Sequence, residues 1–171
     1  MCKKVKVALA WALIAILAVL AAYCWGMAIK TACAEDGTWN CWVVCQPDSW
    51  VSVRTRPSLG SSVIGRVLDG QKLTADAWTE NGWYHITDLP LEESEGWVCM
   101  DYLSDQEPTY CDGETWTVEA NGRVAVREGM GGQRKMWLVP GQQVEVYMLA
   151  DEWAVTEYGF VKTEYLVAGH E

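Results

Sequence analysis

Hydrophobic and polar residues alternate along residues 50–70, and this alternation is the clearest structural signal in the chain. Val51 and Val53 fall on one face of an extended segment, and the polar residues beside them fall on the other. Pro57 ends this strand because proline has no backbone N–H to donate to a neighbouring strand. A second apolar run covers residues 63–67 and leads into an Asp-Gly turn signal. The pattern predicts a strand, an irregular loop, a second strand and a hairpin, which together form a fragment of a small barrel.

Short strands and turns of the same kind extend over residues 41–103. Glu80-Asn81-Gly82 predicts a tight turn, and Pro90 argues against a central strand in the acidic loop at 87–95. The further strands are expected at residues 41–45, 72–78, 83–86 and 96–100. The first barrel is therefore predicted at residues 41–103.

Several motifs in this stretch carry a family resemblance. They are V-x-V-R-x-x-P-S at residues 51–58, S-x-V-I-G-x-V-x-x-G at 61–70, G-W-Y-H-I at 82–86, and G-W-V at 96–98 followed by Tyr-Leu at 102–103. In order and spacing they resemble a bacterial SH3-like domain over about residues 42–103. The resemblance implies a small β-barrel, and domains of this family commonly bind cell-wall peptides or protein segments. It does not name a ligand, because one barrel fold hosts many binding tasks.

Residues 115–167 repeat this pattern in a weaker form. The matching segments are 116–119 with 42–45, 124–127 with 51–54, 139–144 with 68–73, 153–155 with 83–85, and 159–166 with 96–103. The second copy is degenerate, because Gly129-Met130-Gly131-Gly132 replaces the Pro-Ser turn. The sequence thus predicts an all-β fold of two tandem small SH3-like barrels, with a linker at 104–114 and an N-terminal hydrophobic helix ahead of them. Cores of this size are marginal alone, so the barrels are expected to pack together.

Residues 1–34 have the layout of an export signal. Three lysines at positions 3, 4 and 6 precede an uncharged run at 7–29, and Ala32-Cys33-Ala34 fits a small-x-small cleavage site. The run of 23 residues is also long enough to cross a bilayer as an uncleaved anchor. Lipidation of Cys33 is a third alternative, disfavoured by Lys30 at a position where a lipoprotein signal has an aliphatic residue. All three interpretations place the barrels outside the cytoplasm, either secreted or at the extracellular face of the cytoplasmic membrane.

Charge is distributed unevenly along the chain. All 23 acidic residues follow Ala34, whereas four of the 13 basic residues precede it, which leaves a formal charge of −14 after Ala34. So acidic a surface disfavours nucleic acid, anionic lipid and other polyanions as partners. The only membrane contact expected is through residues 7–29, if these are not removed.

The sequence offers no catalytic constellation and predicts a protein that is not an enzyme, with no cofactor and no metal site. His85 and His170 are the only side chains with an ordinary pKa near neutrality. His85 stands in a strand beside Trp83, where a packed structural histidine is the commoner case, and His170 is the penultimate residue, where chains are usually loose. No Cys/His spacing suggests zinc, and no Gly-rich loop has the setting to cradle a phosphate.

A binding role is the better hypothesis. We expect an exported module that recognises a cell-wall peptide or another extended peptide at the bacterial surface, because aromatic grooves suit extended chains. The alternative is a membrane-anchored acidic protein that mediates protein–protein contacts or acts as a spacer. The candidate contact residues are Trp50, Trp78, Trp83, Tyr84 and Tyr102, of which about half are expected to be buried packing. Trp50 and Tyr84 are preferred because each is out of phase with neighbours expected to face inward.

The repeat also predicts which cysteines lie close together. Cys45 aligns with Glu119, and Cys99 aligns with Lys162. If the opening and closing strands of each barrel are neighbours, one copy sets two cysteines across from each other and the other sets an opposite-charge pair there, on an outward face. Cys45 and Cys99 are then a candidate disulfide in an oxidising exterior, and four free thiols are the alternative. The leftover pair would be Cys41 and Cys111.

Overall fold

A computed structural model describes residues 31–33 and 37–169 of the 171-residue chain. Contacts divide the chain into two units, Met1–Lys30 and Thr31–Glu171, and everything described below belongs to the second unit. The expected N-terminal helix and most of the export signal lie outside the described residues. Within the described ranges, no helix is long and apolar enough to cross a membrane.

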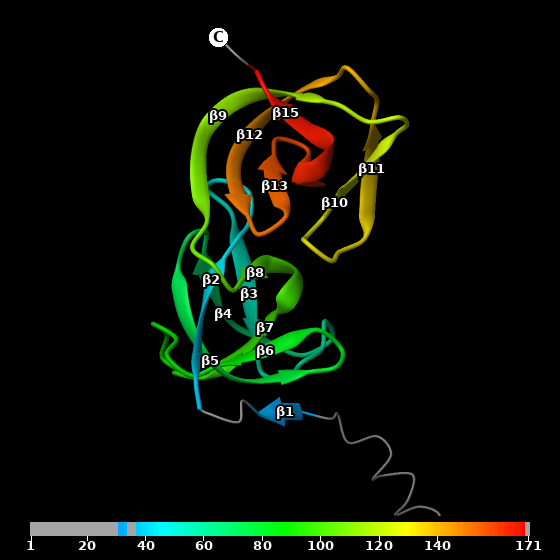
Figure 1. Ribbon diagram of the computed structural model, residues 1–171. Coiled ribbons are helices and arrows are strands. Elements are labelled where there is room, and N and C mark those ends of the chain that lie inside the picture. The colour runs from blue at the N-terminus through cyan, green and yellow to red at the C-terminus, as the bar shows by residue number, and fades with distance from the viewer. Residues whose placement is uncertain (1–30, 34–36, 170–171) are drawn as a thin grey trace, which may run out of the picture. The chain divides into compact units, whose positions relative to one another are not determined.

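The first half of the second unit is an antiparallel sheet that curls into a barrel (Figure 1). Its strand order is β4-β3-β7-β6-β5-β2-β8, and the short strand β1 pairs with β5 off this path. A three-residue 3-10 helix, η1 (Met100–Tyr102), joins β7 to β8. The strands are β1 (Thr31–Cys33), β2 (Trp39–Val43), β3 (Trp50–Arg54), β4 (Val63–Leu68), β5 (Lys72–Thr79), β6 (Trp83–Ile86), β7 (Gly96–Cys99) and β8 (Leu103–Ser104).

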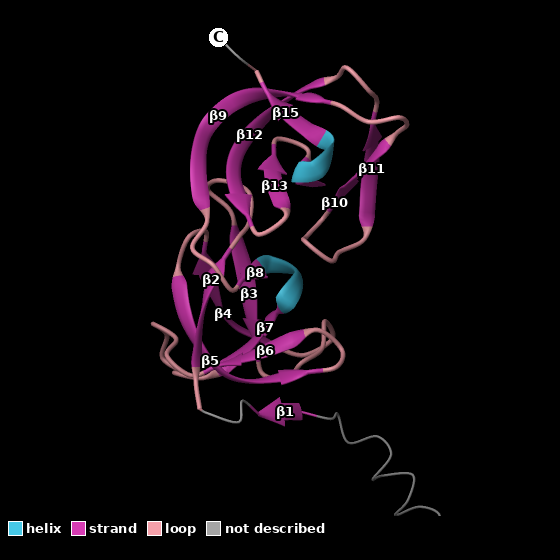
Figure 2. Ribbon diagram, in the orientation of Figure 1, coloured by secondary structure: helices cyan, strands magenta, loops and turns pink. Residues whose placement is uncertain are grey.

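The second half is another antiparallel sheet with the same strand order. The order β11-β10-β14-β13-β12-β9-β15 matches that of the first sheet strand for strand, and η2 (Thr163–Tyr165) stands where η1 stood. Figure 2 shows strands throughout, with only these two short helices, so the all-β prediction is confirmed for the described residues. The strands are β9 (Thr109–Val118), β10 (Val124–Arg127), β11 (Arg134–Leu138), β12 (Gln143–Ala150), β13 (Trp153–Thr156), β14 (Gly159–Lys162) and β15 (Leu166–Ala168).

Two local devices recur at equivalent places in both sheets. The turns after β4 and β11 each carry a glycine with positive φ, Gly70 at 71° and Gly141 at 79°, a conformation that side chains with a Cβ rarely adopt. An arginine at the end of β3 or β10 fixes the loop that follows: Arg54 Nη1 donates to the Ser61 carbonyl at 2.8 Å, and Arg127 Nη1 donates to the Gly132 carbonyl at 2.8 Å. The loops therefore differ in sequence but are held in the same way.

Each sheet closes over its own apolar core. Alternate residues of β5 and β12 are buried, as their burial patterns show, and Leu73 of β5 and Val146 of β12 are among those that fill the two cores. Val53 and Val98 in the first core and Val126 and Val161 in the second are fully buried, each side chain contributing about 1.5–3 kcal/mol.

A third apolar cluster, which we call the junction cluster, joins the two barrels. The outer face of β12–β14 presents Met148, Val155 and Phe160 to Val44 and Tyr102 of the first barrel. The rings of Tyr102 and Phe160 meet edge to face, with centroids 6.2 Å apart. Because this face is covered, all four residues of β13 are buried. The barrels therefore pack together, as their small cores led us to expect.

Polar contacts hold the same junction. The N–H of Met130 donates to the Asp101 carbonyl at 2.7 Å, and Gln46 Nε2 donates to the carbonyls of Thr156 and Glu157 at 3.0 and 3.1 Å. A Cβ added at Gly129 would lie 2.7 Å from the Asp101 carbonyl oxygen. The glycine-rich loop that replaced the Pro-Ser turn thus packs so closely against η1 that it leaves no room for a side chain at Gly129.

The predicted linker is shorter in the structure than in the sequence analysis. Of residues 104–114, those from Thr109 onward belong to β9, which pairs with β12 on both sides of a register shift. Asp112 and Gly113, with φ of 49° and 81°, form this irregularity inside a strand. An Asp-Gly pair taken as loop material is therefore a bulge.

The repeat alignment is wrong by one residue in its first segment. Val44 N–H donates to the Tyr102 carbonyl and Glu119 N–H donates to the Tyr165 carbonyl, both at 2.9 Å, so Glu119 is the counterpart of Val44 and not of Cys45. The other matched segments keep their register, and Cys99 and Lys162 both pair with the first tryptophan of the preceding strand. A shift of one residue moves a side chain to the opposite face of its strand.

The premise of the cysteine prediction is wrong as well. The opening strand β2 lies between β5 and β8, whereas the closing strand β7 lies between β3 and β6. Cys45 is buried and belongs to the first core, so it does not face outward as predicted. All four cysteines after Ala34, including Cys41 and Cys111, are free thiols in the structure.

Candidate functional site

A cleft of about 400 Å³ opens where the two barrels meet, and we call it the junction cleft. One wall comes from β3, the loops beside it, β6 and η1 of the first barrel, and the other comes from β10, β11 and β14 of the second. Its lining residues are Cys45, Gln46, Ser49, Trp50, Val51, Ser52, Arg54, Leu59, Trp83, Cys99, Tyr102, Arg127, Glu128, Lys135, Gly159 and Phe160.

Three of the five predicted contact residues line this cleft: Trp50, Trp83 and Tyr102. Trp50 begins β3 and is 42% exposed, with the guanidinium carbon of Arg66 stacked 3.7 Å from its ring centroid. Trp83 is only 5% exposed and forms part of the cleft floor. Tyr102 reaches the cleft from η1. With Phe160 of the second barrel, the cleft is lined by four aromatic residues, of which Trp50 is the most exposed.

The other two candidates lie elsewhere. Tyr84 faces the core side of β6, opposite Val98, and its ring meets that of Trp39 edge to face at 5.3 Å. Burial raises the pKa of the Tyr84 hydroxyl to about 12, and the nearby Asp105 carboxylate adds to the rise. Trp78 is 39% exposed on β5 and does not line the junction cleft. The expected outward direction of Tyr84 is wrong: Trp83 and Ile86 lie on opposite faces of β6 and both are buried, so alternation alone does not say which face meets the core.

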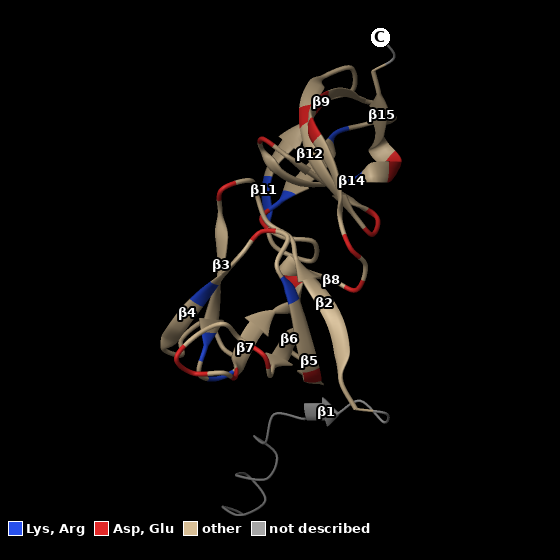
Figure 3. Cartoon of the chain, turned by 90° about the vertical axis from the view of Figure 1, so that its left-hand side faces the viewer, with Lys and Arg blue, Asp and Glu red and all other residues tan. Residues whose placement is uncertain are grey.

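The lining is more basic than the rest of the chain. Arg54, Arg127 and Lys135 stand against a single acid, Glu128, although the chain as a whole carries a formal charge of −10. Figure 3 shows acidic residues scattered over both barrels and basic residues gathered on fewer strands, among them β4 and β11. A ligand with a carboxylate would be attracted here despite the overall charge.

Sequence reasoning missed the half of the cleft that comes from the second barrel. Gly159 and Phe160 lie more than a hundred positions after Gln46, and Arg127 lies 81 positions after it, so only the docking of the barrels brings them together. Leu59, 76% exposed at the tip of the loop after β3, was treated only as turn material.

Cys45 and Cys99 also line the junction cleft, as free thiols. Burial raises the pKa of the Cys45 thiol to about 12, with the Asp69 carboxylate contributing to the rise. Burial also raises the pKa of the Cys99 thiol. Both thiols therefore stay protonated at neutral pH and are poor nucleophiles.

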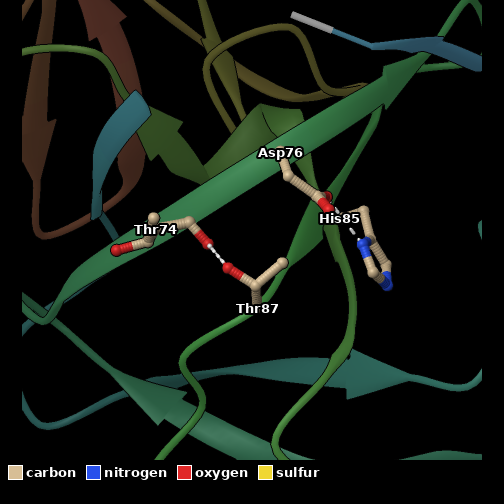
Figure 4. A network of polar contacts seen from close by, with 4 residues as sticks. All are labelled: Thr74, Asp76, His85 and Thr87. Atoms are coloured by element: carbon tan, nitrogen blue, oxygen red, sulfur yellow. Dashed lines mark hydrogen bonds and ion pairs between the residues drawn. The ribbon is translucent and has the colours of Figure 1, made fainter. Parts of the chain in front are cut away.

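His85 has the one contact in the described residues that resembles a catalytic dyad. Its Nδ1 lies 2.7 Å from Asp76 Oδ1, and its ring packs on Trp97 with centroids 4.9 Å apart. Figure 4 shows the surroundings of this pair, in which Thr87 Oγ1 donates to the Thr74 carbonyl. The contacts of the His85 ring with Asp76 and Trp97 bring no hydroxyl or thiol that could act as a nucleophile. The arrangement suits a structural histidine that links β5 to β6.

The described residues contain no cluster of three or more side chains suited to hold a metal ion.

The motifs on which the family resemblance was based lie in the first barrel, on β3, β4, β6 and β7 and the turns beside them. Residues 49–104 match the family model of the bacterial SH3 domain. The match starts just before β3 and ends with β8, and it lies within the first barrel. The bacterial SH3 domain supports the description of this chain as a non-catalytic binding module.

Solved structures with a similar arrangement are remote from this chain. They include NlpC1 of Trichomonas vaginalis (11% identity, covering 84% of this chain and 50% of that one, TM-score 0.34) and NlpC2 of the same organism (10% identity, 80% and 50%, TM-score 0.34). A third solved structure, "Endolysin LysPBC5 CBD", is 10% identical, with the match covering 80% of this chain and 98% of that one and a TM-score of 0.30. The chain spans about half the length of the two NlpC proteins. No curated protein sequence matches it.

Proposed function

We propose that this protein is an exported binding module that holds an extended cell-wall peptide in the junction cleft. The observation that carries the proposal is the position of Trp50, Trp83 and Tyr102 around one cleft beside a bacterial SH3 domain. The cleft volume of about 400 Å³ is within the range of about 300–1,000 Å³ that is usual for ligand sites.

The lining suits a peptide better than an apolar small molecule. Aromatic faces pack against an extended chain and tolerate different side chains, while polar side chains fix its direction through hydrogen bonds. Gln46, Ser49 and Ser52 supply such groups beside Trp50. The basic residues Arg54 and Lys135 would attract a carboxylate of the peptide.

The cell surface follows from the N-terminal segment and the domain type together. The basic start and long apolar run of residues 1–34 would deliver the barrels outside the cytoplasm, either released or still anchored. Bacterial cell-wall peptides are available only there. Protease treatment of intact cells should therefore remove both barrels while cytoplasmic proteins survive.

Sedimentation with purified peptidoglycan tests the proposed ligand. The wild-type protein should pellet with peptidoglycan, and Trp50→Ala should weaken the affinity, measured from the bound fraction at increasing amounts of peptidoglycan, about tenfold, since loss of one stacked aromatic contact costs about 1–2 kcal/mol. Trp78→Ala is the matched control, because Trp78 is 39% exposed against 42% for Trp50 but lies outside the cleft.

Two outcomes would contradict the proposal. If the wild-type protein stays in the supernatant, the formal charge of −14 after Ala34 favours the alternative, an acidic surface protein that binds another protein or acts as a spacer. If Trp78→Ala and Trp50→Ala weaken binding equally, the ligand lies outside the junction cleft.

A further inference from the structure

The second barrel carries a cleft of its own, of about 830 Å³, which we call the second cleft. It is lined from β10, β11, η2 and the loops around them, and none of its lining residues comes from the first barrel. The proposed function does not use this cleft.

The second cleft stands at the place in the second barrel that the junction cleft occupies in the first. Strand pairing makes Val124, Ala125 and Arg127 the counterparts of Val51, Ser52 and Arg54. Trp153 and Lys162 pair with each other as Trp83 and Cys99 do. Tyr165 ends η2 as Tyr102 ends η1. All of these residues line their respective clefts.

Both barrels carry an exposed tryptophan and an arginine on this surface, but in the second barrel each stands at the position that the other occupies in the first barrel. In the first barrel Trp50 precedes Val51 on β3, and Arg66 lies on the facing strand β4. In the second barrel the position of Trp50 holds Arg123, and the position of Arg66 holds Trp137. Trp137 is 44% exposed, close to the 42% of Trp50, and it too has a guanidinium over its ring, that of Arg134 at 4.6 Å.

The second cleft is not a docking face for another barrel of the same kind. In the first barrel, Val44 at this end is fully buried against the second barrel. Its counterpart Glu119 is charged and exposed, and Cys99 is replaced by Lys162. Burying Glu119 in an apolar contact would cost several kcal/mol without a partner. This end of the second barrel is therefore built to stay in contact with water and soluble ligands.

The lining of the second cleft carries both signs of charge. Glu119 and Glu164 stand with Arg123, Arg127 and Lys162, around Trp137 and Tyr165. Such a surface complements a peptide that carries amino and carboxylate groups close together. Arg127 lines both clefts, so they adjoin each other along the molecule.

We propose that the second cleft is a second subsite, which binds the next peptide of the same wall polymer when the junction cleft holds the first. This rests on the proposed function and extends it from one peptide to two consecutive ones. Two linked sites raise the affinity for a ligand that spans both, typically by a factor of about 10² or more, because the second contact forms within one complex.

Soluble wall fragments of two sizes test this: a single disaccharide-peptide and a cross-linked dimer, both released from peptidoglycan by a muramidase. By titration calorimetry, the wild-type protein should bind the dimer at least tenfold more tightly than the monomer. Trp137→Ala should bring the affinity for the dimer down to that for the monomer. Arg123→Glu, a change at an exposed side chain, should have the same effect. Trp78→Ala again serves as the control outside both clefts.

The outcomes separate this inference from the proposed function. If Trp50→Ala weakens binding but Trp137→Ala and Arg123→Glu leave the preference for the dimer unchanged, the second cleft is not a subsite and the proposed function stands. If the wild-type protein binds neither fragment nor intact peptidoglycan, both proposals are wrong.

Discussion

The close contact between the loop at Gly129 and η1 can be tested by adding one methyl group to that loop. Gly129→Ala would place a Cβ 2.7 Å from the Asp101 carbonyl oxygen and 2.9 Å from its Cβ. Both distances are well inside van der Waals contact, and one of the atoms is backbone, so the loop has to move away from η1. That movement strains the 2.7 Å hydrogen bond from the Met130 N–H to Asp101 and the packing of Met130 in the junction cluster. We expect the free energy of unfolding to fall by about 1–3 kcal/mol.

Gly122→Ala provides the matched control. A Cβ at Gly122 meets nothing within 4 Å, and its φ is outside the positive region, so alanine should be neutral or should stabilise the fold by up to about 1 kcal/mol. Urea titration followed by tryptophan fluorescence measures both variants. If Gly129→Ala proves as stable as Gly122→Ala, the loop does not press on η1 and the description of the junction is wrong.

Two further changes probe the packing and the thiols. Phe160→Ala should lower the free energy of unfolding by about 3–5 kcal/mol, because the side chain is 1% exposed in the junction cluster. The same urea titration measures this change, and an unchanged free energy of unfolding would mean that the barrels do not bury Phe160. Burial raises the pKa of the Cys41 and Cys45 thiols from 9.0 to about 12. Because the folded state holds these protons more tightly than the unfolded state, stability should be unaffected below pH 9 and should decline from there to about pH 12. Iodoacetamide at pH 8 should correspondingly label neither thiol until urea is added, and fast labelling of the native protein would refute their burial.

The strands and their turns could be predicted from sequence because local rules determine them. Alternation at Val51 and Val53, the Asp-Gly turn at Gly70 and its Pro-Gly counterpart at Gly141 all depend on residues within a few positions of one another. The Asp112-Gly113 pair shows the limit of the same rules. It has turn composition, but pairing with β12 on both sides makes it a bulge within β9.

The site was predictable only in part, because its walls come from distant segments. Trp50, Trp83 and Tyr102 were found from composition and position within one barrel. Tyr84 was misplaced because Trp83 and Ile86 are both buried although they lie on opposite faces of β6, so that alternation did not separate core from surface. Phe160 was not considered, because the docking that brings it to the cleft depends on a face of β14 that reads from sequence as solvent-exposed or buried equally well.

The contact between the barrels joins two different faces, the η1 end of one and the β12–β14 face of the other. Contacts of this head-to-tail kind extend into filaments unless the faces left at the two ends are unsuited to each other. Glu119 makes the η2 end of the second barrel unsuited to a further contact of this kind, since it stands where the first barrel has the buried Val44. At the opposite face, strand pairing makes His85 the counterpart of Val155 in the junction cluster, and His85 is bound to Asp76. The Asp76–His85 contact thus has a structural role that needs no catalysis. It places a polar pair on a face of the first barrel whose counterpart in the second barrel holds Val155 and is covered. At these two positions, an apolar residue stands where the barrels meet and a charged or polar one stands where they do not, Val44 against Glu119 and Val155 against His85, which favours a chain that forms this interface once and leaves the second cleft open.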